Sequence, residues 1–386
     1  MQSSSTPAPL PLPLPPSRGF PLRRVLRSLA ALLLAAVLLE LGAQAIKTYI
    51  IPRKWAKIDA TNRMAPQPLS GIDYADTVEG RGARIGTLSV NSLGLRGPEP
   101  KLPNERQPGR LRVYCLGSST TFGWGASTDA ATYPAQLEAQ LRAILPQEQI
   151  DVVNAGVPGN NSESEFQILQ QDLPRLKPDI VILWSGWPDW AHYLTAPSKP
   201  KRNRLTDDLV NAFQKTGSCR CAEYLRDLIL PRPAPPTEEE LAKRAGLPKF
   251  RADVLDQFSK KLAEMIELCK QQGAVPIVLG LASPLRTEPD KLSPLARKQA
   301  ANRLHALPDA SHQDLYRGVL DFDRKLEETT QKTATLYLDP KNLPSEPELF
   351  FDGVHMNDAG YAALAAAIAP EIKRAADCRN RPQPCP

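Results

Sequence analysis

The sequence predicts an α/β fold built on a parallel sheet. From about residue 111 onward, short apolar runs rich in β-forming residues alternate with longer segments of helical periodicity. The runs 111–117 and 150–154 each end abruptly in a turn of small and hydroxylated residues. Alternating strands and helices imply right-handed crossovers, and therefore a doubly wound parallel sheet with its chemistry at the carboxyl ends of the strands.

The individual elements follow from their hydrophobic patterns. The predicted strands are the apolar runs 111–117, 150–154, 179–184, 274–280 and 335–338. The predicted helices are the periodic segments 132–145, 162–176, 251–272, 312–331 and 358–376. Ser162 and Glu165 have the spacing of a capping box at the start of their helix. Two proline-rich and charged segments, 191–248 and 284–310, interrupt the alternation and are expected to be irregular insertions or lids.

The N-terminal region has the composition of a membrane-targeting segment. Residues 1–20 are rich in Pro and Ser and are predicted to be a disordered tail. Within 21–50, a hydrophobic run follows three arginines and has about the ~20 residues that a membrane span needs. This segment is either an uncleaved single-pass anchor or a signal peptide that is cut near Ala45 and releases a secreted protein. In both cases we expect the large domain outside the cytoplasm, either periplasmic or on the cell surface.

Composition excludes several classes of function. The net charge of +6 comes from scattered basic residues without a cationic run, which argues against a nucleic-acid partner. The six cysteines contain no Cys-x-x-Cys pair, which argues against a zinc ribbon or a thioredoxin motif. The cysteines of the mid-chain insertion and the C-terminal tail could pair in an oxidising compartment, or all six could remain thiols. No cluster of metal ligands is present in the pattern, so neither a metal nor a cofactor is predicted.

The turn after the first predicted strand admits three chemical interpretations. A phosphate-binding loop would need a second glycine five positions after Gly117, followed directly by Lys. Instead Gly123 is six positions after Gly117, and no Lys follows it. A dinucleotide loop would need a third glycine in register after Gly123-Trp124-Gly125. What remains is an ordinary strand-to-helix connection or the turn of a hydrolase nucleophile, Ser119.

A nucleophilic serine requires a base, and the chain has four histidines. Three of them have an aspartate three residues earlier, so this spacing alone does not separate them. His355 follows the last predicted strand, at the same edge of the sheet as Ser119, and is the first candidate, with Asp352 as its partner. His192 follows the third strand and is the second candidate, whereas His312 is expected to open a helix.

Four sequence blocks together resemble those of the SGNH/GDSL hydrolases. They are, in order, Gly117-Ser118-Ser119-Thr120-Thr121-Phe122-Gly123, Asn154-Ala155-Gly156-Val157-Pro158-Gly159, Gly186-Trp187-Pro188-Asp189 and Asp352-Gly353-Val354-His355. The segment 91–97 and the N-terminal anchor are similar to membrane-associated bacterial members. The resemblance implies a flavodoxin-like three-layer sandwich with a five-stranded parallel sheet. It also implies hydrolysis of esters or thioesters, or acyl transfer.

The resemblance assigns roles to particular residues and divides the chain. It implies Ser119 as nucleophile, His355 as base and Asp352 as the group that orients the base. It places an oxyanion hole at the backbone N–H groups of Ser119 and Gly159, and it requires no metal. The hydrolase domain is then 111–376, preceded by a lead-in at 51–110 and followed by a C-terminal tail at 377–386.

Two positions depart from the family pattern. Ser118 stands where the family name has Asp, a residue that is not the nucleophile. Pro188 stands where the family has an Asn that supplies the third oxyanion donor, and proline has neither a side-chain amide nor a backbone N–H. Loss of one such donor costs ~10²–10³ in rate. Asn160 or Asn161 could supply the missing donor.

Tryptophans offer a further set of candidates. The indole N–H of Trp187 or Trp190 is an alternative third donor, and their rings could line the substrate cleft, since aromatic faces suit sugars and acyl chains. Packing beneath the first insertion is the other interpretation of this pair.

The expected function is that of a serine hydrolase that cleaves a carboxylic ester through an acyl-enzyme. The substrate could be an O-acetyl group on an envelope glycan, or a lipid or thioester. Two alternatives remain open: a catalytically weak or inactive envelope protein that binds a glycan or a partner, and an O-acyltransferase.

Overall fold

Five parallel strands form the centre of the computed structural model. The structure describes residues 89, 91, 93–100, 105–106, 108–195, 237, 240–241, 244–307 and 309–379. The strands are β1 (Arg110–Gly117), β2 (Gln149–Gly156), β3 (Ile180–Trp184), β4 (Val275–Leu279) and β5 (Leu336–Leu338). Their order in the sheet is β2-β1-β3-β4-β5, and every neighbouring pair is parallel. This is the flavodoxin-like order, which confirms the predicted doubly wound sheet.

The central strands are buried on both faces, as their continuous apolar runs predict. All eight residues of β1 and all five of β3 are buried. Along β1, Tyr114 and Leu116 belong to one hydrophobic cluster, whereas Val113 and Cys115 belong to the other. The sheet therefore separates two cores, one on each face.

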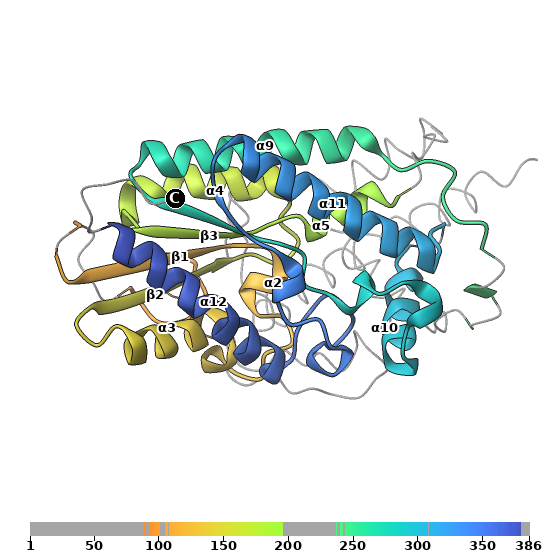
Figure 1. Ribbon diagram of the computed structural model, residues 1–386, viewed down its shortest axis with the longest axis horizontal. Helices are drawn as coiled ribbons and strands as arrows, with labels where there is room; N and C mark the ends of the chain where they lie inside the picture. The colour runs from red at the N-terminus through yellow and green to blue at the C-terminus, as the bar shows by residue number, and fades with distance from the viewer. Residues whose placement is uncertain are drawn as a thin grey trace, which may run out of the picture. The chain divides into compact units, whose positions relative to one another are not determined.

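Helices cover both faces and complete a three-layer sandwich (Figure 1). One face carries α3 (Tyr133–Ile144) and α12 (Asp358–Arg379), which lie side by side. The other face carries α4 (Ser162–Leu176), α9 (Ala252–Gln271) and α11 (His312–Lys332). The predicted layers are thus confirmed, and the helix boundaries lie within a few residues of those expected from the sequence.

The segment 284–310 is more ordered than the expected irregular insertion. It contains helix α10 (Pro294–His305) and the 3-10 turns η4 (Pro284–Arg286) and η5 (Pro289–Lys291). Ser293 caps α10 by accepting a hydrogen bond from the Ala296 N–H. A Ser followed by a Pro is a helix-start signal, which was obscured by the surrounding prolines and charges.

Several predicted segments fall mainly or wholly outside the described residues. These are the tail 1–20, the membrane segment 21–50, most of the lead-in 51–110, residues 196–236 of the first insertion and the tail beyond 379. Where that insertion begins, helix α5 (Trp187–Tyr193) continues into it. Across the ranges that the structure describes, no helix is long and apolar enough to cross a membrane.

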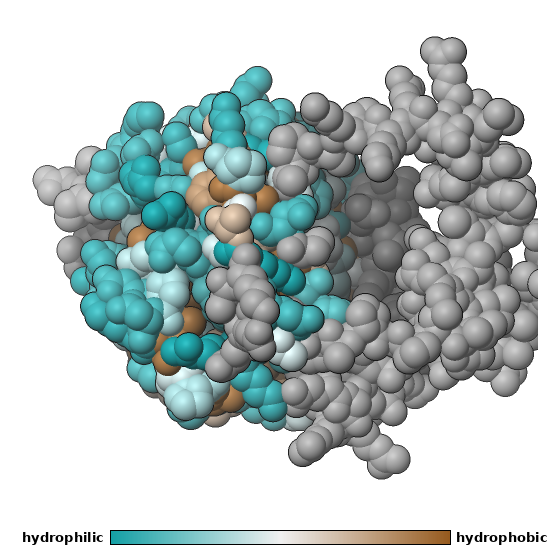
Figure 2. Space-filling model, turned by 90° about the vertical axis from the view of Figure 1, so that its right-hand side faces the viewer, coloured by the Kyte–Doolittle hydropathy of each residue, from teal (hydrophilic) through white to brown (hydrophobic). Residues whose placement is uncertain are grey.

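The described end of the lead-in packs into the core of the α/β domain. Leu95 is buried, and Arg96 forms an antiparallel bridge with Asn154 of β2. Figure 2 shows one face of the domain, on which hydrophobic residues form small areas among hydrophilic ones. The large hydrophobic side chains exposed in the described ranges are Ile144, Leu295 and Leu336, which lie on separate elements.

Candidate active site

Two tight turns meet at the carboxyl ends of β1 and β2. The short helix α2 (Ser119–Phe122) begins two residues after the end of β1. The turn after β2 is attached to it, because the Val157 N–H donates to the Gly117 carbonyl at 3.0 Å. Only glycine fits at Gly156, where a Cβ atom would lie 1.9 Å from the Phe122 nitrogen. Since β1 lies between β2 and β3, Ser119 stands at the topological switch point of the sheet.

A chain of hydrogen bonds joins Ser119, His355 and Asp352. The Ser119 Oγ lies 2.8 Å from His355 Nε2. The His355 Nδ1 lies 2.9 Å from Asp352 Oδ2. Ser119 and His355 are both partly exposed, so a substrate can reach them. In this arrangement the imidazole can accept the hydroxyl proton through Nε2 while Nδ1–H donates to the carboxylate.

The Asp352 carboxylate accepts hydrogen bonds on both oxygens. Its Oδ1 accepts from the backbone N–H groups of Val354 at 3.1 Å and His355 at 2.9 Å. Burial raises the pKa of Asp352, but the charges of Arg303 and His355 and the hydrogen bonds from His355 outweigh it and hold this pKa well below its ordinary value. The carboxylate is therefore ionised, with its orientation fixed by its own loop.

Arg303 is a member of this site that the sequence reasoning missed. It comes from the last turn of α10, and its guanidinium Nη2 lies 2.5 Å from Asp352 Oδ2, the same oxygen that faces His355. The pairing joins residues 49 positions apart, so no local spacing reveals it. Recognition of α10 as a helix with a basic last turn was the one available signal.

The other histidines do not form this arrangement. His192 is exposed on α5, and Asp189 accepts instead from the Ser162 N–H at 2.9 Å and the Ser162 hydroxyl at 2.8 Å. His312 lies in the first turn of α11, as expected. Among the described residues, His355 is therefore the one histidine of an Asp-x-x-His pair that lies within hydrogen-bond distance of Ser119.

Two backbone donors lie free at the expected oxyanion hole. In the described part of the chain, neither the Ser119 nor the Gly159 N–H has a hydrogen-bond acceptor. Gly159 is exposed and has a φ of +83°, and a Cβ atom there would meet nothing within 4 Å. Its turn is closed by a bond from the Asn160 N–H to the Val157 carbonyl at 3.2 Å.

The two asparagines after Gly159 have different surroundings. The Asn160 side chain is buried, and its Nδ2 lacks a partner among the described residues. Asn161 instead caps α4, where its side chain accepts from the Ser164 N–H at 3.1 Å. The capping residue of α4 is therefore Asn161 and not Ser162, so the predicted capping box of Ser162 and Glu165 is wrong. Asn160 thus offers a buried amide donor without a partner, whereas the cap fixes the orientation of the Asn161 side chain on α4.

The tryptophan pair is buried in the core, which favours the packing interpretation over the predicted substrate-binding role. Trp187 and Trp190 are 4% and 1% exposed, and their rings meet edge to face with centroids 5.4 Å apart. The Trp190 Nε1 lies against Gly318 of α11, on the side of the helix layer. Trp190 is thus excluded as an oxyanion donor. Pro188, between them, is tolerated in the first turn of α5.

Trp124 is the aromatic residue that lies beside the site. It is partly exposed, and its ring centroid is 6.2 Å from that of His355. The sequence signal was the Gly-Trp-Gly stretch directly after the nucleophile turn. Within the described residues, no group of three or more His, Cys, Asp or Glu side chains could hold a metal ion.

Comparisons with known proteins identify the family of the chain. The model of the GDSL-like lipase/acylhydrolase family matches residues 115–363. Among solved structures, a GDSL-like lipase from Bacteroides thetaiotaomicron is 15% identical, with 68% of this chain and 88% of that chain covered and a TM-score of 0.37. An acetylxylan esterase from Geobacillus stearothermophilus is 19% identical, with 68% and 94% covered and a TM-score of 0.39. No curated protein matches the chain.

The family match spans most of the chain and includes Ser119, Asp352 and His355. The chain therefore belongs to the GDSL-like lipase/acylhydrolase family.

Proposed function

We propose that this protein is a serine hydrolase that cleaves a carboxylic ester through an acyl-enzyme. The observation that carries the proposal is the hydrogen-bonded chain from the Ser119 hydroxyl through His355 to an ionised Asp352. Such a chain activates a hydroxyl that is otherwise a weak nucleophile at neutral pH.

Each residue has a defined role in the proposed reaction. His355 Nε2 takes the proton of Ser119 as Oγ attacks the ester carbonyl, and Asp352 stabilises the imidazolium that forms. The free N–H groups of Ser119 and Gly159 donate to the oxyanion of the tetrahedral intermediate. When the intermediate collapses, the alcohol leaves with the proton from His355. Water then attacks the acyl-enzyme with His355 again as base, which releases the carboxylic acid and restores the serine.

A third oxyanion donor is proposed in place of the family's asparagine. Pro188 cannot donate, whereas the Asn160 Nδ2 follows directly after the Gly159 donor in the chain and lacks a partner in the described part. The Asn160 amide is nearly inaccessible to solvent, so it would act after a rotation of its side chain. The Trp187 Nε1, which is also buried and unpartnered there, is the other candidate.

The proposed substrate is an O-acetyl group on an envelope glycan. This proposal rests on the expected extracytoplasmic location, with the chain held at the membrane by 21–50 or secreted after cleavage near Ala45. The partly exposed indole of Trp124 near His355 supports it, because an indole face can stack on a sugar ring. An acylated lipid or a thioester would use the same residues.

Two other functions are each favoured by a specific feature. Pro188 favours a catalytically weak or inactive protein that binds a glycan or a partner in the envelope. An O-acyltransferase would share all the residues of the site, and would differ only in that a glycan hydroxyl, rather than water, resolves the acyl-enzyme.

Ester hydrolysis distinguishes these functions. Purified protein is incubated with 4-nitrophenyl esters of increasing acyl length and with O-acetylated polysaccharides, with Ser119→Ala as the matched control. The proposal expects acetyl release that depends on Ser119 and falls for longer acyl chains. Transfer of acetyl to an added glycan in preference to water would indicate the transferase. Glycan binding without acetyl release in either variant would contradict the hydrolase.

A further inference from the structure

Arg96 approaches the nucleophile helix from a segment outside the four family blocks. The segment is held by Asn91, whose Oδ1 accepts from the Leu93 N–H at 3.0 Å and the Leu95 N–H at 3.1 Å. The Asn91 Nδ2 also donates to the Pro98 carbonyl at 3.0 Å. This closed turn directs Arg96 into the domain, where its side chain is 1% exposed.

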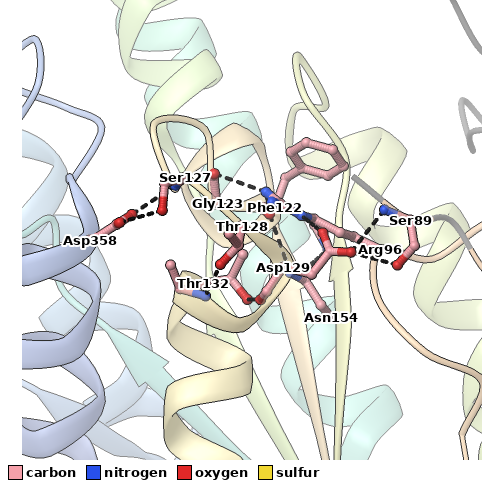
Figure 3. Close-up of polar contacts among 12 residues, drawn as sticks. Ser89, Arg96, Phe122, Gly123, Ser127, Thr128, Asp129, Thr132, Asn154 and Asp358 are labelled. Atoms are coloured by element: carbon pink, nitrogen blue, oxygen red, sulfur yellow. Dashed lines mark hydrogen bonds and ion pairs between the residues drawn. The ribbon is translucent and has the colours of Figure 1, made fainter. Parts of the chain in front are cut away.

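The Arg96 guanidinium holds the C-terminal end of α2. Its Nη1 donates to the carbonyls of Phe122 at 2.8 Å and Gly123 at 2.9 Å (Figure 3). These carbonyls are among those that a helix end leaves without intrahelical partners. The guanidinium carbon also lies 4.9 Å from the centroid of the Phe122 ring. The Asn154 Nδ2 donates to the same Phe122 carbonyl at 3.3 Å.

A second nitrogen of the Arg96 guanidinium contacts the loop that follows α2. The Arg96 Nε donates to Asp129 Oδ1 at 2.8 Å, and Asp129 Oδ2 accepts from the Ser89 N–H at 2.8 Å. The same loop is attached to the start of α12, three residues after His355, because the Ser127 N–H donates to Asp358 Oδ1 at 2.8 Å. Figure 3 shows these contacts as one series from Ser89 to Asp358. The loop therefore connects the nucleophile helix with the start of α12, directly after the loop that carries His355.

Helix α2 needs such support because it is a single turn. It has four residues, and a lone helical turn is unstable without tertiary contacts. Ser119 is its first residue, and the Ser119 carbonyl accepts from the Gly123 and Trp124 N–H groups at 3.1 and 2.9 Å. Any shift of Phe122 and Gly123 is therefore transmitted across one turn to Ser119, and changes the 2.8 Å contact between Oγ and His355 Nε2.

We propose that Arg96 is a positioning residue for the nucleophile: it fixes the C-terminal end of α2 and thereby the place of Ser119 relative to His355. This inference rests on the proposed hydrolase function for its kinetic consequence, but its structural consequence is independent of that function. Misplacement of a reacting group by about 1 Å costs ~10²-fold in rate. Arg96→Met should therefore lower the rate of acylation far more than it weakens ligand binding.

Arg112 offers a matched control. It is also fully buried and paired with a carboxylate, with its Nη2 2.9 Å from Asp151, but it lies near the amino end of β1, away from Ser119. Each variant leaves a carboxylate without its arginine partner, Asp151 in the core or the partly buried Asp129, so both should lower the melting temperature. A purely structural role of Arg96 would make the two variants alike in every other respect.

The experiment compares Arg96→Met, Arg96→Lys and Arg112→Met in the full chain at a temperature where each is folded. Inactivation by a fluorophosphonate is resolved into its maximal rate and its half-saturating concentration, and hydrogen–deuterium exchange is measured across 117–124. We expect Arg96→Met to lose ~10²-fold in maximal rate with little change in half-saturation, and to exchange faster in 117–124. Arg96→Lys should recover part of both losses, since an ammonium can still donate to the two carbonyls.

Equal losses in Arg96→Met and Arg112→Met, or unchanged exchange in 117–124, would overturn the proposal. If Arg96→Met does not fold, Asp129→Asn replaces it, because this change removes the ion pair and keeps the shape of the side chain. If the unaltered protein does not react with the probe, the proposed hydrolase function fails. Hydrogen–deuterium exchange across 117–124, compared between Arg96→Met and the unaltered protein, then still decides whether Arg96 holds α2.

Discussion

Arg303 should stabilise the folded protein through its ion pair with Asp352. Its Nη2 donates to Asp352 Oδ2 at 2.5 Å, the oxygen that also faces His355 Nδ1. Two unit charges about 4 Å apart interact by ~4 kcal/mol at an effective dielectric constant of about 20. Because Arg303 is 22% exposed, we halve this figure for solvent screening, to ~2 kcal/mol.

The pH dependence of this contribution follows from the pKa of Asp352. The charge of Arg303 lowers this pKa in the folded state. A carboxyl group with a lowered pKa contributes stability that is complete above the ordinary aspartate pKa of about 3.9, and that is lost as the pH falls through the lowered pKa. Arg303→Met should therefore be less stable than the unaltered protein by ~2 kcal/mol at neutral pH, and the difference should shrink at acid pH.

The assay measures the free energy of urea unfolding over the acidic and neutral range. Arg297→Met is the matched control, since it removes the same charge from the same helix without an ion pair to Asp352 among the described residues. The control should match the unaltered protein at each pH. An Arg303→Met variant that is as stable as the unaltered protein at neutral pH, or a difference that grows as the pH falls, would refute the electrostatic reasoning.

Two further predictions concern the oxyanion hole and a buried acid. Pro188→Asn should raise turnover at least several-fold if the hole lacks a donor, as measured by the steady-state rate with saturating ester; an unchanged or lower rate counts against that view. Burial raises the pKa of Glu165 to about 8, and the nearby charge of Asp189 adds to this effect against a lowering hydrogen bond from Ser185. The folded state therefore binds an extra proton between the unfolded pKa of about 4.5 and about 8, so stability falls as pH rises through this window. Glu165→Gln, which mimics the protonated acid, should be more stable than the unaltered protein at pH 8 by a few kcal/mol, of order 3–5, and similar to it at pH 4.5, as measured by urea unfolding. An equal difference at the two pH values would contradict the assignment.

The sequence was sufficient for those parts of the site that depend on local signals. The strand before Ser119 is a continuous apolar run followed by small residues, and the loop of Asp352 and His355 follows the last strand. In a parallel sheet the carboxyl ends of the strands meet at one edge, so the two segments could be placed together without coordinates. Ser119 and His355 do lie within hydrogen-bond distance.

The contacts missed from the sequence depend on pairing across long stretches of chain. Arg303 and Asp352 lie on different elements, and the helix that carries Arg303 was obscured by prolines. Arg96 received no role from its sequence pattern, although it is buried against Phe122 and Asp129. No periodicity in the sequence distinguishes an arginine that faces solvent from one that caps a distant helix.

The tryptophans illustrate a different difficulty. Trp187 and Trp190 follow the third strand at the functional edge, which favoured a place in the cleft. They belong to α5, whose buried face packs against α9 and α11. The position of an element at the correct edge does not fix the direction of its side chains. A different tryptophan, Trp124, is the one that lies near His355.

Covalent labelling of the serine tests the central claim most directly. The purified full chain is treated with a fluorophosphonate probe, and the adduct is located by mass spectrometry, with Ser119→Ala and His355→Ala as controls. An activated nucleophile predicts an adduct on Ser119 that is lost in Ser119→Ala and strongly reduced in His355→Ala. Absence of labelling in a folded, unaltered protein would contradict the account, and would make a binding protein of the envelope the leading interpretation.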